Sequence, residues 1–155
     1  MRDGVQTDTF KRLQGLVLAG MLALAVFGGL PTRAEADFRR WYPYAEALEL
    51  GLEHGRPVLL YFRSDHCPYC EQMETFVLSA PDVEGLMEHC TVVASITLGR
   101  SSTAALGQRW RVFGTPSFVF VRYQHGRWTE VERVFGSLPR DRFLEFLRRV
   151  CKEEG

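Results

Sequence analysis

The feature that most constrains this chain is the segment Cys67-Pro68-Tyr69-Cys70, which stands between a continuous apolar run and an amphipathic stretch. The run Pro57–Phe62 is typical of a strand buried on both faces of a sheet. Pro68 is tolerated in the first turn of a helix, where its missing N–H would have no partner anyway. Two cysteines three positions apart in a helical turn lie on one face, close enough to form a disulfide bond. The sequence therefore predicts a cysteine pair at the junction of a buried strand and a helix.

This junction would make the first cysteine reactive. A sulfur at a helix N-terminus lies near the positive end of the helix dipole and near free backbone N–H groups, which lower the pKa of Cys67. His66 and Arg63 would add positive charge, although both are equally explained as solvated side chains. Because only a thiolate attacks a disulfide, we expect Cys67 to be the nucleophile and the more buried Cys70 to resolve the mixed disulfide. The predicted catalytic, redox-active residues are Cys67 and Cys70, with His66 tuning the pKa of the thiol.

Two other interpretations of the cysteine pair are weaker. A Cys-x-x-Cys pair is half of many zinc sites, with His66 or His89 as further ligands, but those sites usually contain a second Cys-x-x-Cys or a His-x-x-x-His motif, and this sequence has neither. A purely structural disulfide would close too small a loop to add much stability. We therefore expect no metal and no cofactor.

The first 36 residues differ in composition from the rest of the chain. Lys11 and Arg12 precede an uncharged apolar stretch over 13–30, and Ala34-Glu35-Ala36 offers the small residues that a signal peptidase reads. We expect residues 1–36 to be a cleaved secretory signal peptide, with an N-terminal anchor in the inner membrane as the alternative. Either case predicts that residues 37–155 act in the periplasm, where disulfides persist.

Charge and length add modest constraints. Lys plus Arg and Asp plus Glu both number 19, and the basic residues form no long run, so nothing indicates a nucleic-acid partner. The length of 155 residues suits one domain with a hydrophobic core rather than two. We expect a single domain over 37–155 that works as a monomer.

Apolar periodicity and turn residues predict an alternation of helices and strands. We expect helices over 42–54, 68–79, 82–89, 103–110 and 140–150, and strands over 57–62, 91–98, 117–123 and 129–135. Helices between successive strands imply a parallel pair in the middle of the sheet, and the turn at His125-Gly126 makes the last two strands an antiparallel hairpin. The predicted fold class is α/β, with a central mixed sheet of about four to five strands flanked by helices.

The sequence resembles the thioredoxin superfamily over essentially all of residues 37–155. The resemblance is carried by the strand Val58–Phe62, by the cysteine pair at the start of a helix, and by Gly114-Thr115-Pro116 before the hairpin. In that family this proline is cis and packs beside the cysteine pair, so the resemblance implies a cis Thr115–Pro116 bond. It also implies a thioredoxin-like fold in which Tyr69, Thr115 and Pro116 bind the substrate.

Within the superfamily, the segments Gly55–Leu60 and Cys70–Glu74 are similar to those of bacterial periplasmic thioredoxins. The sequence departs from cytoplasmic thioredoxins at two positions. Those proteins carry a buried Asp six residues before the first cysteine and a Trp directly before it, and here the two positions hold Tyr61 and His66. The proton-relay role of that acid is therefore not expected to carry over to this chain.

The resemblance implies an enzyme, a protein-disulfide oxidoreductase that reduces disulfides in exported proteins and is fed by a membrane-bound electron donor. The same residues would serve a disulfide-forming oxidase or an isomerase, with a membrane-bound acceptor in place of the donor. The sequence leaves the direction open. The alternative from another class is a redox-inactive module that binds or holds other proteins.

Two further cysteines are predicted by topology to lie far from the reactive pair. The helix that begins at the cysteine pair descends from the active-site end of the sheet, which puts Cys90 at the opposite end. The last helix also starts near the active-site end and descends, which brings Cys151 to the same far end. We expect a structural Cys90–Cys151 disulfide, with two separate thiols as the alternative.

Overall fold

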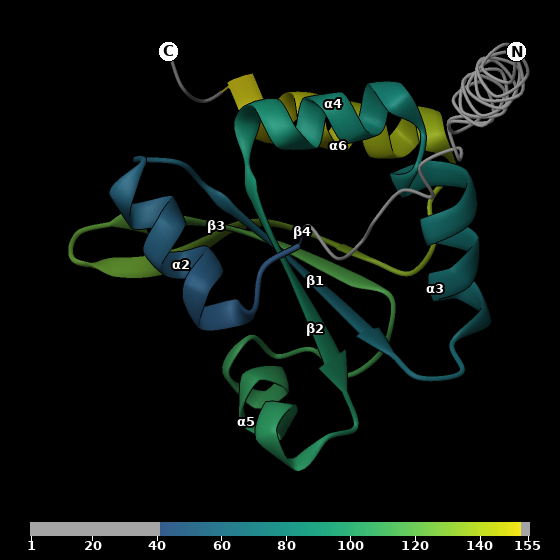
Figure 1. The fold of residues 1–155 in the computed structure, drawn as a ribbon, viewed down its shortest axis with the longest axis horizontal. Helices are drawn as coiled ribbons and strands as arrows, with labels where there is room; N and C mark the ends of the chain where they lie inside the picture. The colour runs from purple at the N-terminus through teal and green to yellow at the C-terminus, as the bar shows by residue number, and fades with distance from the viewer. Residues whose placement is uncertain (1–40, 153–155) are drawn as a thin grey trace, which may run out of the picture. The chain divides into compact units, whose positions relative to one another are not determined.

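The computed structural model describes residues 41–152 of the chain, and the expected signal peptide or anchor over 1–36 lies outside them. Figure 1 shows a central sheet with helices on both faces. The helical elements are α2 (Tyr44–Glu53), α3 (Pro68–Met73), the π-helical turn η2 (Glu74–Leu78), α4 (Pro81–Cys90), α5 (Ser101–Arg109) and α6 (Arg140–Lys152). The strands are β1 (Val58–Ser64), β2 (Val92–Leu98), β3 (Ser117–Gln124) and β4 (Arg127–Phe135). The α/β thioredoxin-like class predicted from the sequence is confirmed.

The four strands form one mixed sheet in the order β2-β1-β3-β4. Strands β1 and β2 are parallel, whereas β3 is antiparallel to both β1 and β4. The expectation of a parallel pair in mid-sheet is therefore wrong in one respect, because β2 lies at the edge of the described four-stranded sheet and β1 and β3 take the centre. The first five residues of each of the two central strands are all buried.

The hydrophobic core has two halves, one on each face of the sheet, because side chains of a strand alternate between the faces. Leu59 and Tyr61 of β1 point toward α3, α4 and α6 and pack with Phe118 and Phe143. Val58, Leu60 and Phe62 point the other way, toward α2 and α5. Figure 1 shows α4 and α6 side by side on the first face. Burial of each such side chain contributes about 1.5–3 kcal/mol, so this alternation fixes the orientation of β1.

The segment after the cysteine pair differs from the single helix that the periodicity predicts. Helix α3 ends at Met73, and the chain continues as the π-helical turn η2 before α4 starts at Pro81. A π-helical turn widens the hydrogen-bond spacing by one residue and often occurs near functional sites. The backbone N–H of Leu138, in the segment before α6, contacts Met73 Sδ at 3.2 Å and ties α3 to the C-terminal part of the fold.

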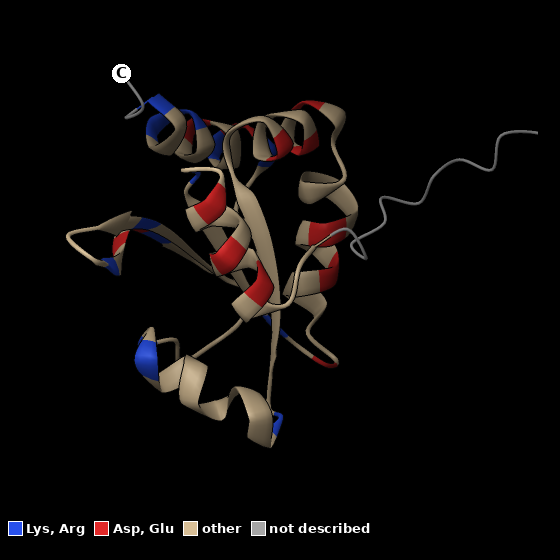
Figure 2. Ribbon diagram, turned by 60° about the vertical axis from the view of Figure 1, so that its left-hand side comes forward, with Lys and Arg blue, Asp and Glu red and all other residues tan. Residues whose placement is uncertain are grey.

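Charge is unevenly distributed although the totals balance. Figure 2 shows acidic residues along α2, α3 and α4, and basic residues gathered toward the end of α6. Helix α2 contains three glutamates and no lysine or arginine, whereas α6 contains four arginines and one lysine. No helix between residues 41 and 152 is both long enough and apolar enough to cross a membrane.

The end of the sheet where β1 begins holds the second cysteine pair. Cys90, the last residue of α4, is joined by a disulfide bond to Cys151 in the last turn of α6. Arg122 of β3 donates a hydrogen bond of 2.6 Å to the backbone oxygen of Val150, next to Cys151. These contacts hold the C-terminal helix against α4 and the sheet.

Candidate active site

The cysteine pair lies where the chain leaves β1 and enters α3. His66 has a φ of 58°, a left-handed conformation that turns the chain sharply before the helix. Cys67 follows as the N-cap residue in an extended conformation, and Pro68 occupies the first helical turn. The backbone oxygen of Cys67 accepts hydrogen bonds from the N–H groups of Cys70 and Glu71, at 3.0 and 3.1 Å. The strand end and the helix start therefore hold Cys67 at the helix N-terminus.

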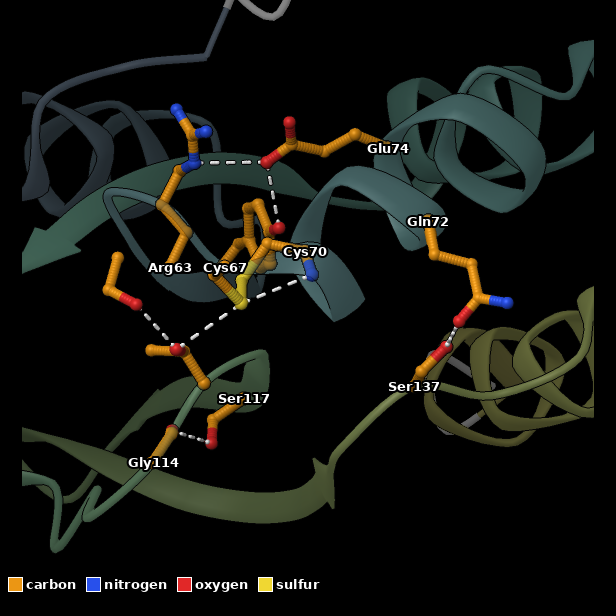
Figure 3. The surroundings of a disulfide bond; sticks show 11 residues. Arg63, Cys67, Cys70, Gln72, Glu74, Gly114, Ser117 and Ser137 are labelled. Atoms are coloured by element: carbon orange, nitrogen blue, oxygen red, sulfur yellow. Dashed lines mark hydrogen bonds and ion pairs between the residues drawn. A yellow bond between two sulfur atoms is a disulfide. The ribbon is translucent and has the colours of Figure 1, made fainter.

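Cys67 and Cys70 form a disulfide with a Cα–Cα distance of 5.2 Å, within the ordinary range for such bonds. Cys67 retains 8% of its surface exposed, whereas Cys70 is completely buried. Figure 3 shows that the N–H of Cys70 points to Cys67 Sγ, and the two atoms are 3.1 Å apart. An incoming thiolate or disulfide can thus reach only the first sulfur directly.

A second donor reaches the same sulfur from the loop before β3. The Thr115–Pro116 peptide bond is cis, and Pro116 is buried. The hydroxyl of Thr115 donates to Cys67 Sγ at 3.5 Å, and Ser64 Oγ lies 2.8 Å from Thr115 Oγ1. The backbone N–H of Gly136 donates to the oxygen of Pro116 at 2.9 Å and anchors this loop to the end of β4. Thr115 and Pro116 are therefore held beside the cysteine pair.

A polar cluster lies on the core side of the cysteine pair. The buried hydroxyl of Tyr61 donates to Glu74 Oε1 at 2.9 Å, and Arg63 Nε forms an ion pair with the same oxygen, also at 2.9 Å. Figure 3 shows Arg63 and Glu74 facing each other across the end of β1. Burial, together with the negative charge of Glu74, raises the pKa of Tyr61 above its ordinary value of 10.0. The phenol therefore remains neutral and donates a hydrogen bond to the carboxylate.

Replacement of Tyr61 by phenylalanine is expected to change the response of stability to alkali. Because the pKa of Tyr61 is higher in the folded protein, the stability that its neutral hydroxyl gives the fold is fully present below pH 10. It is lost progressively as the pH rises above 10. The free energy of unfolding of the unmodified protein should fall by about 1.4 kcal/mol per pH unit from this group, and Tyr61→Phe should remove that contribution. At pH 7 the variant should lose about 1 kcal/mol with the hydrogen bond.

The measurement is urea denaturation at pH 7 and at steps between about pH 9.5 and 11.5. Tyr123→Phe is the matched control, since Tyr123 is 46% exposed on β3. Equal alkaline slopes for Tyr61→Phe and the unmodified protein would show that Tyr61 titrates normally.

The structure brings most of the residues predicted from the sequence together. Cys67, Cys70, Thr115 and Pro116 meet at one point, and Tyr69 lies between the cysteines with 64% of its surface exposed. His66 directly precedes Cys67 and is exposed. Its effect on the thiol stays a prediction. Among residues 41–152, no group of three or more His, Cys, Asp or Glu side chains is placed to hold a metal ion.

Two site residues were not predicted from the sequence. Glu74 lies seven positions after Cys67 and four after Cys70, a spacing that repeats on one face of a helix and that could have indicated it. Ser64 is separated from Thr115 by 51 positions. Only the pairing of β1 with β3 brings these two together.

The geometry defines the class of protein. A slightly exposed sulfur paired with a buried one, and provided with two hydrogen-bond donors, is suited to exchange disulfides with another molecule. The protein is a thiol:disulfide oxidoreductase. It belongs to the thioredoxin-like domain family, whose model matches residues 44–150.

Individual relatives agree with this assignment. The chain is 32% identical over 137 residues to the thiol:disulfide interchange protein DsbD of Ralstonia nicotianae, covering 86% of this chain and 22% of the relative. It is 28% identical over 109 residues to DsbD 1 of Pseudomonas aeruginosa, covering 70% of this chain and 18% of the relative. The chain thus spans about a fifth of the length of these curated relatives.

Solved structures show the same fold. A thioredoxin from Thermus thermophilus is 54% identical, with a TM-score of 0.70, over 75% of this chain and 89% of that one. The C-terminal domain of DsbD from Neisseria meningitidis, in its reduced form, is 25% identical, with a TM-score of 0.57, over 68% of this chain and 91% of that one. The chain thus matches only a fifth of the full-length DsbD relatives but nearly all of the isolated C-terminal domain of a DsbD protein.

Proposed function

We propose that this protein reduces disulfides of exported proteins in the periplasm, with Cys67 as the nucleophile and Cys70 as the resolving cysteine. The observation that carries the proposal is the environment of Cys67 Sγ. The sulfur stands at the N-terminus of α3 and accepts hydrogen bonds from the N–H of Cys70 and the hydroxyl of Thr115. Both donors would stabilise a thiolate more strongly than a neutral thiol, because hydrogen bonds to an ionised acceptor are stronger.

The reaction is written as two exchange steps. The Cys67 thiolate attacks one sulfur of a substrate disulfide, so that a Cys67–substrate bond forms and the second substrate sulfur leaves as a thiolate that takes up a proton. Cys70 then loses its proton and attacks Cys67 Sγ, which forms the Cys67–Cys70 bond and releases the first substrate sulfur. Two electrons pass from the dithiol to the substrate, and the protein ends in the disulfide form present in the structure.

Exposed aromatic residues around the cysteine pair support a protein substrate. Tyr69, Phe113 and Phe135 are exposed by 64%, 91% and 70%, and they come from α3, the loop before β3, and the end of β4. The ring of Phe135 packs against Gly114. Phe113 and Phe135 therefore both border the loop that carries Thr115, whose hydroxyl contacts Cys67 Sγ. Exposed apolar groups that cluster on a soluble domain often mark a binding surface. Tyr69, Thr115 and Pro116 are the proposed substrate-contacting residues.

The relatives suggest the pathway. Several are named thiol:disulfide interchange proteins, and one structural neighbour is the C-terminal domain of such a protein. We place this chain in a similar exchange pathway, in which a membrane-bound donor reduces the Cys67–Cys70 disulfide again. The signal peptide or anchor proposed for residues 1–36 would deliver residues 37–155 to the periplasm.

The experiment that tests the direction is the reduction potential of the Cys67/Cys70 couple, measured against glutathione buffers. A reductase is expected to have a potential below about −200 mV, because a more negative couple gives up electrons more readily. A value close to −120 mV, as in strong thiol oxidases, would instead assign the protein to disulfide formation. The Cys90→Ala/Cys151→Ala variant is the control, since it leaves a single couple to titrate.

A further inference from the structure

Ser64 is the last residue of β1 and lies next to the loop that carries the cis-proline. In the antiparallel pairing of β1 with β3, Val58 lies opposite Val121 and Phe62 lies opposite Ser117. Continuing this register by two residues places Ser64 opposite Thr115. Side chains of directly opposed residues are close enough to contact each other. The distance of 2.8 Å between Ser64 Oγ and Thr115 Oγ1 agrees with that geometry.

The proton arrangement of this pair follows from the chemistry of a hydroxyl group. Each hydroxyl carries one hydrogen and accepts through its lone pairs. Thr115 uses its hydrogen toward Cys67 Sγ, at an oxygen–sulfur distance of 3.5 Å. Thr115 Oγ1 can therefore only accept from Ser64, so Ser64 is the donor in their contact. The three groups form a directed chain from Ser64 through Thr115 to the sulfur.

We propose that Ser64 is a positioning residue that orients and polarises the Thr115 hydroxyl toward Cys67 and so stabilises the Cys67 thiolate. A hydroxyl that accepts one hydrogen bond becomes a stronger donor in the next, and neighbouring hydrogen bonds reinforce each other inside a protein. Without Ser64, the Thr115 hydroxyl is free to rotate and to donate elsewhere. Ser64 does not touch the reacting sulfur itself, and the exchange steps stay as written above.

This inference rests on the proposed role of Cys67 as the nucleophile, and its test is a property of the thiol rather than turnover. The reduced protein is alkylated with iodoacetamide across a range of pH, and the rate at Cys67 is followed by mass spectrometry of its peptide. Ser64→Ala is expected to raise the pKa of Cys67 by about half a unit, which lowers the alkylation rate below the pKa about threefold. Ser64→Thr keeps the hydroxyl and should restore the original pKa.

A double-variant cycle identifies the route of the effect. Thr115→Val removes the intermediate hydroxyl at nearly constant shape, so adding Ser64→Ala to it should raise the pKa of Cys67 no further. Ser137→Ala is the matched control, because its hydroxyl contacts the side chain of Gln72 at 3.3 Å on another side of α3 (Figure 3). An unchanged pKa in Ser64→Ala, or the same increase with and without the Thr115 hydroxyl, would overturn the proposal.

If Ser64→Ala does not fold, Ser64→Val is compared with Ser64→Thr. These two side chains have the same shape, and both suit a strand end, so they differ only in the hydroxyl. A higher pKa in the valine variant is the expected result, and equal values contradict the inference. Failure of the proposed function appears separately, as full disulfide-reducing activity in a Cys67→Ser variant.

Discussion

Replacement of Cys70 by alanine is expected to stop turnover and to trap the substrate on Cys67. The variant keeps the sulfur that is attacked first but lacks the one that releases the mixed disulfide. Cys70 is held one helical turn behind Cys67, so its sulfur reaches the mixed disulfide within the same molecule and releases the substrate much faster than a thiol from solution. Reduction of insulin should fall by roughly three orders of magnitude or more, while a covalent Cys67–substrate species accumulates.

The measurement combines insulin turbidity with non-reducing electrophoresis of the protein after exposure to a disulfide substrate. Cys67→Ala is the paired variant, and it should lose both turnover and the trapped species, because the remaining sulfur is inaccessible. A trapped species in Cys67→Ala but not in Cys70→Ala would reverse the two roles. Full turnover in the Cys67→Ser/Cys70→Ser variant would leave only a binding or holding function.

Removal of the second disulfide is expected to destabilise the fold without affecting the chemistry. Cys90 and Cys151 are separated by 61 positions, and the bond closes a loop that contains β2, α5, β3, β4 and nearly all of α6. The loop-entropy relation for a loop of this size gives a contribution of about 4 kcal/mol, the expected loss of unfolding free energy in Cys90→Ala/Cys151→Ala. Urea denaturation of the oxidised proteins measures this difference.

Activity should stay within about twofold of the unmodified protein, because the two disulfides lie at opposite ends of β1. Val92, two residues after Cys90, pairs with Val58 at the start of this strand, whereas Cys67 follows its end at Ser64. Seven strand residues span about 20 Å. Unchanged stability, together with alkylation of Cys90 in the unreduced protein, would show that the bond does not form.

The sequence by itself determined the elements whose signals are local. The apolar run before the cysteine pair, Pro68 in the first turn and the spacing of Cys67 and Cys70 are all read within about fifteen residues, and the structure places β1 and α3 accordingly. The hairpin of β3 and β4 is equally local, since its turn at His125-Gly126 uses two residues with positive φ. Such features depend on neighbours along the chain, so periodicity and turn residues suffice to predict them.

Only the tertiary structure decided which distant side chains gather around the cysteine pair. The strand order places β3 beside β1 and β2 at the edge. This pairing of β1 with β3 brings the hydroxyl of Ser64 into contact with that of Thr115. The packing of η2 against the sheet likewise joined Glu74 to Tyr61 and Arg63, a contact that neither β1 nor η2 specifies by itself. The physical reason is that hydrogen bonds act over about 3 Å, whereas strand pairing and helix packing depend on the whole core.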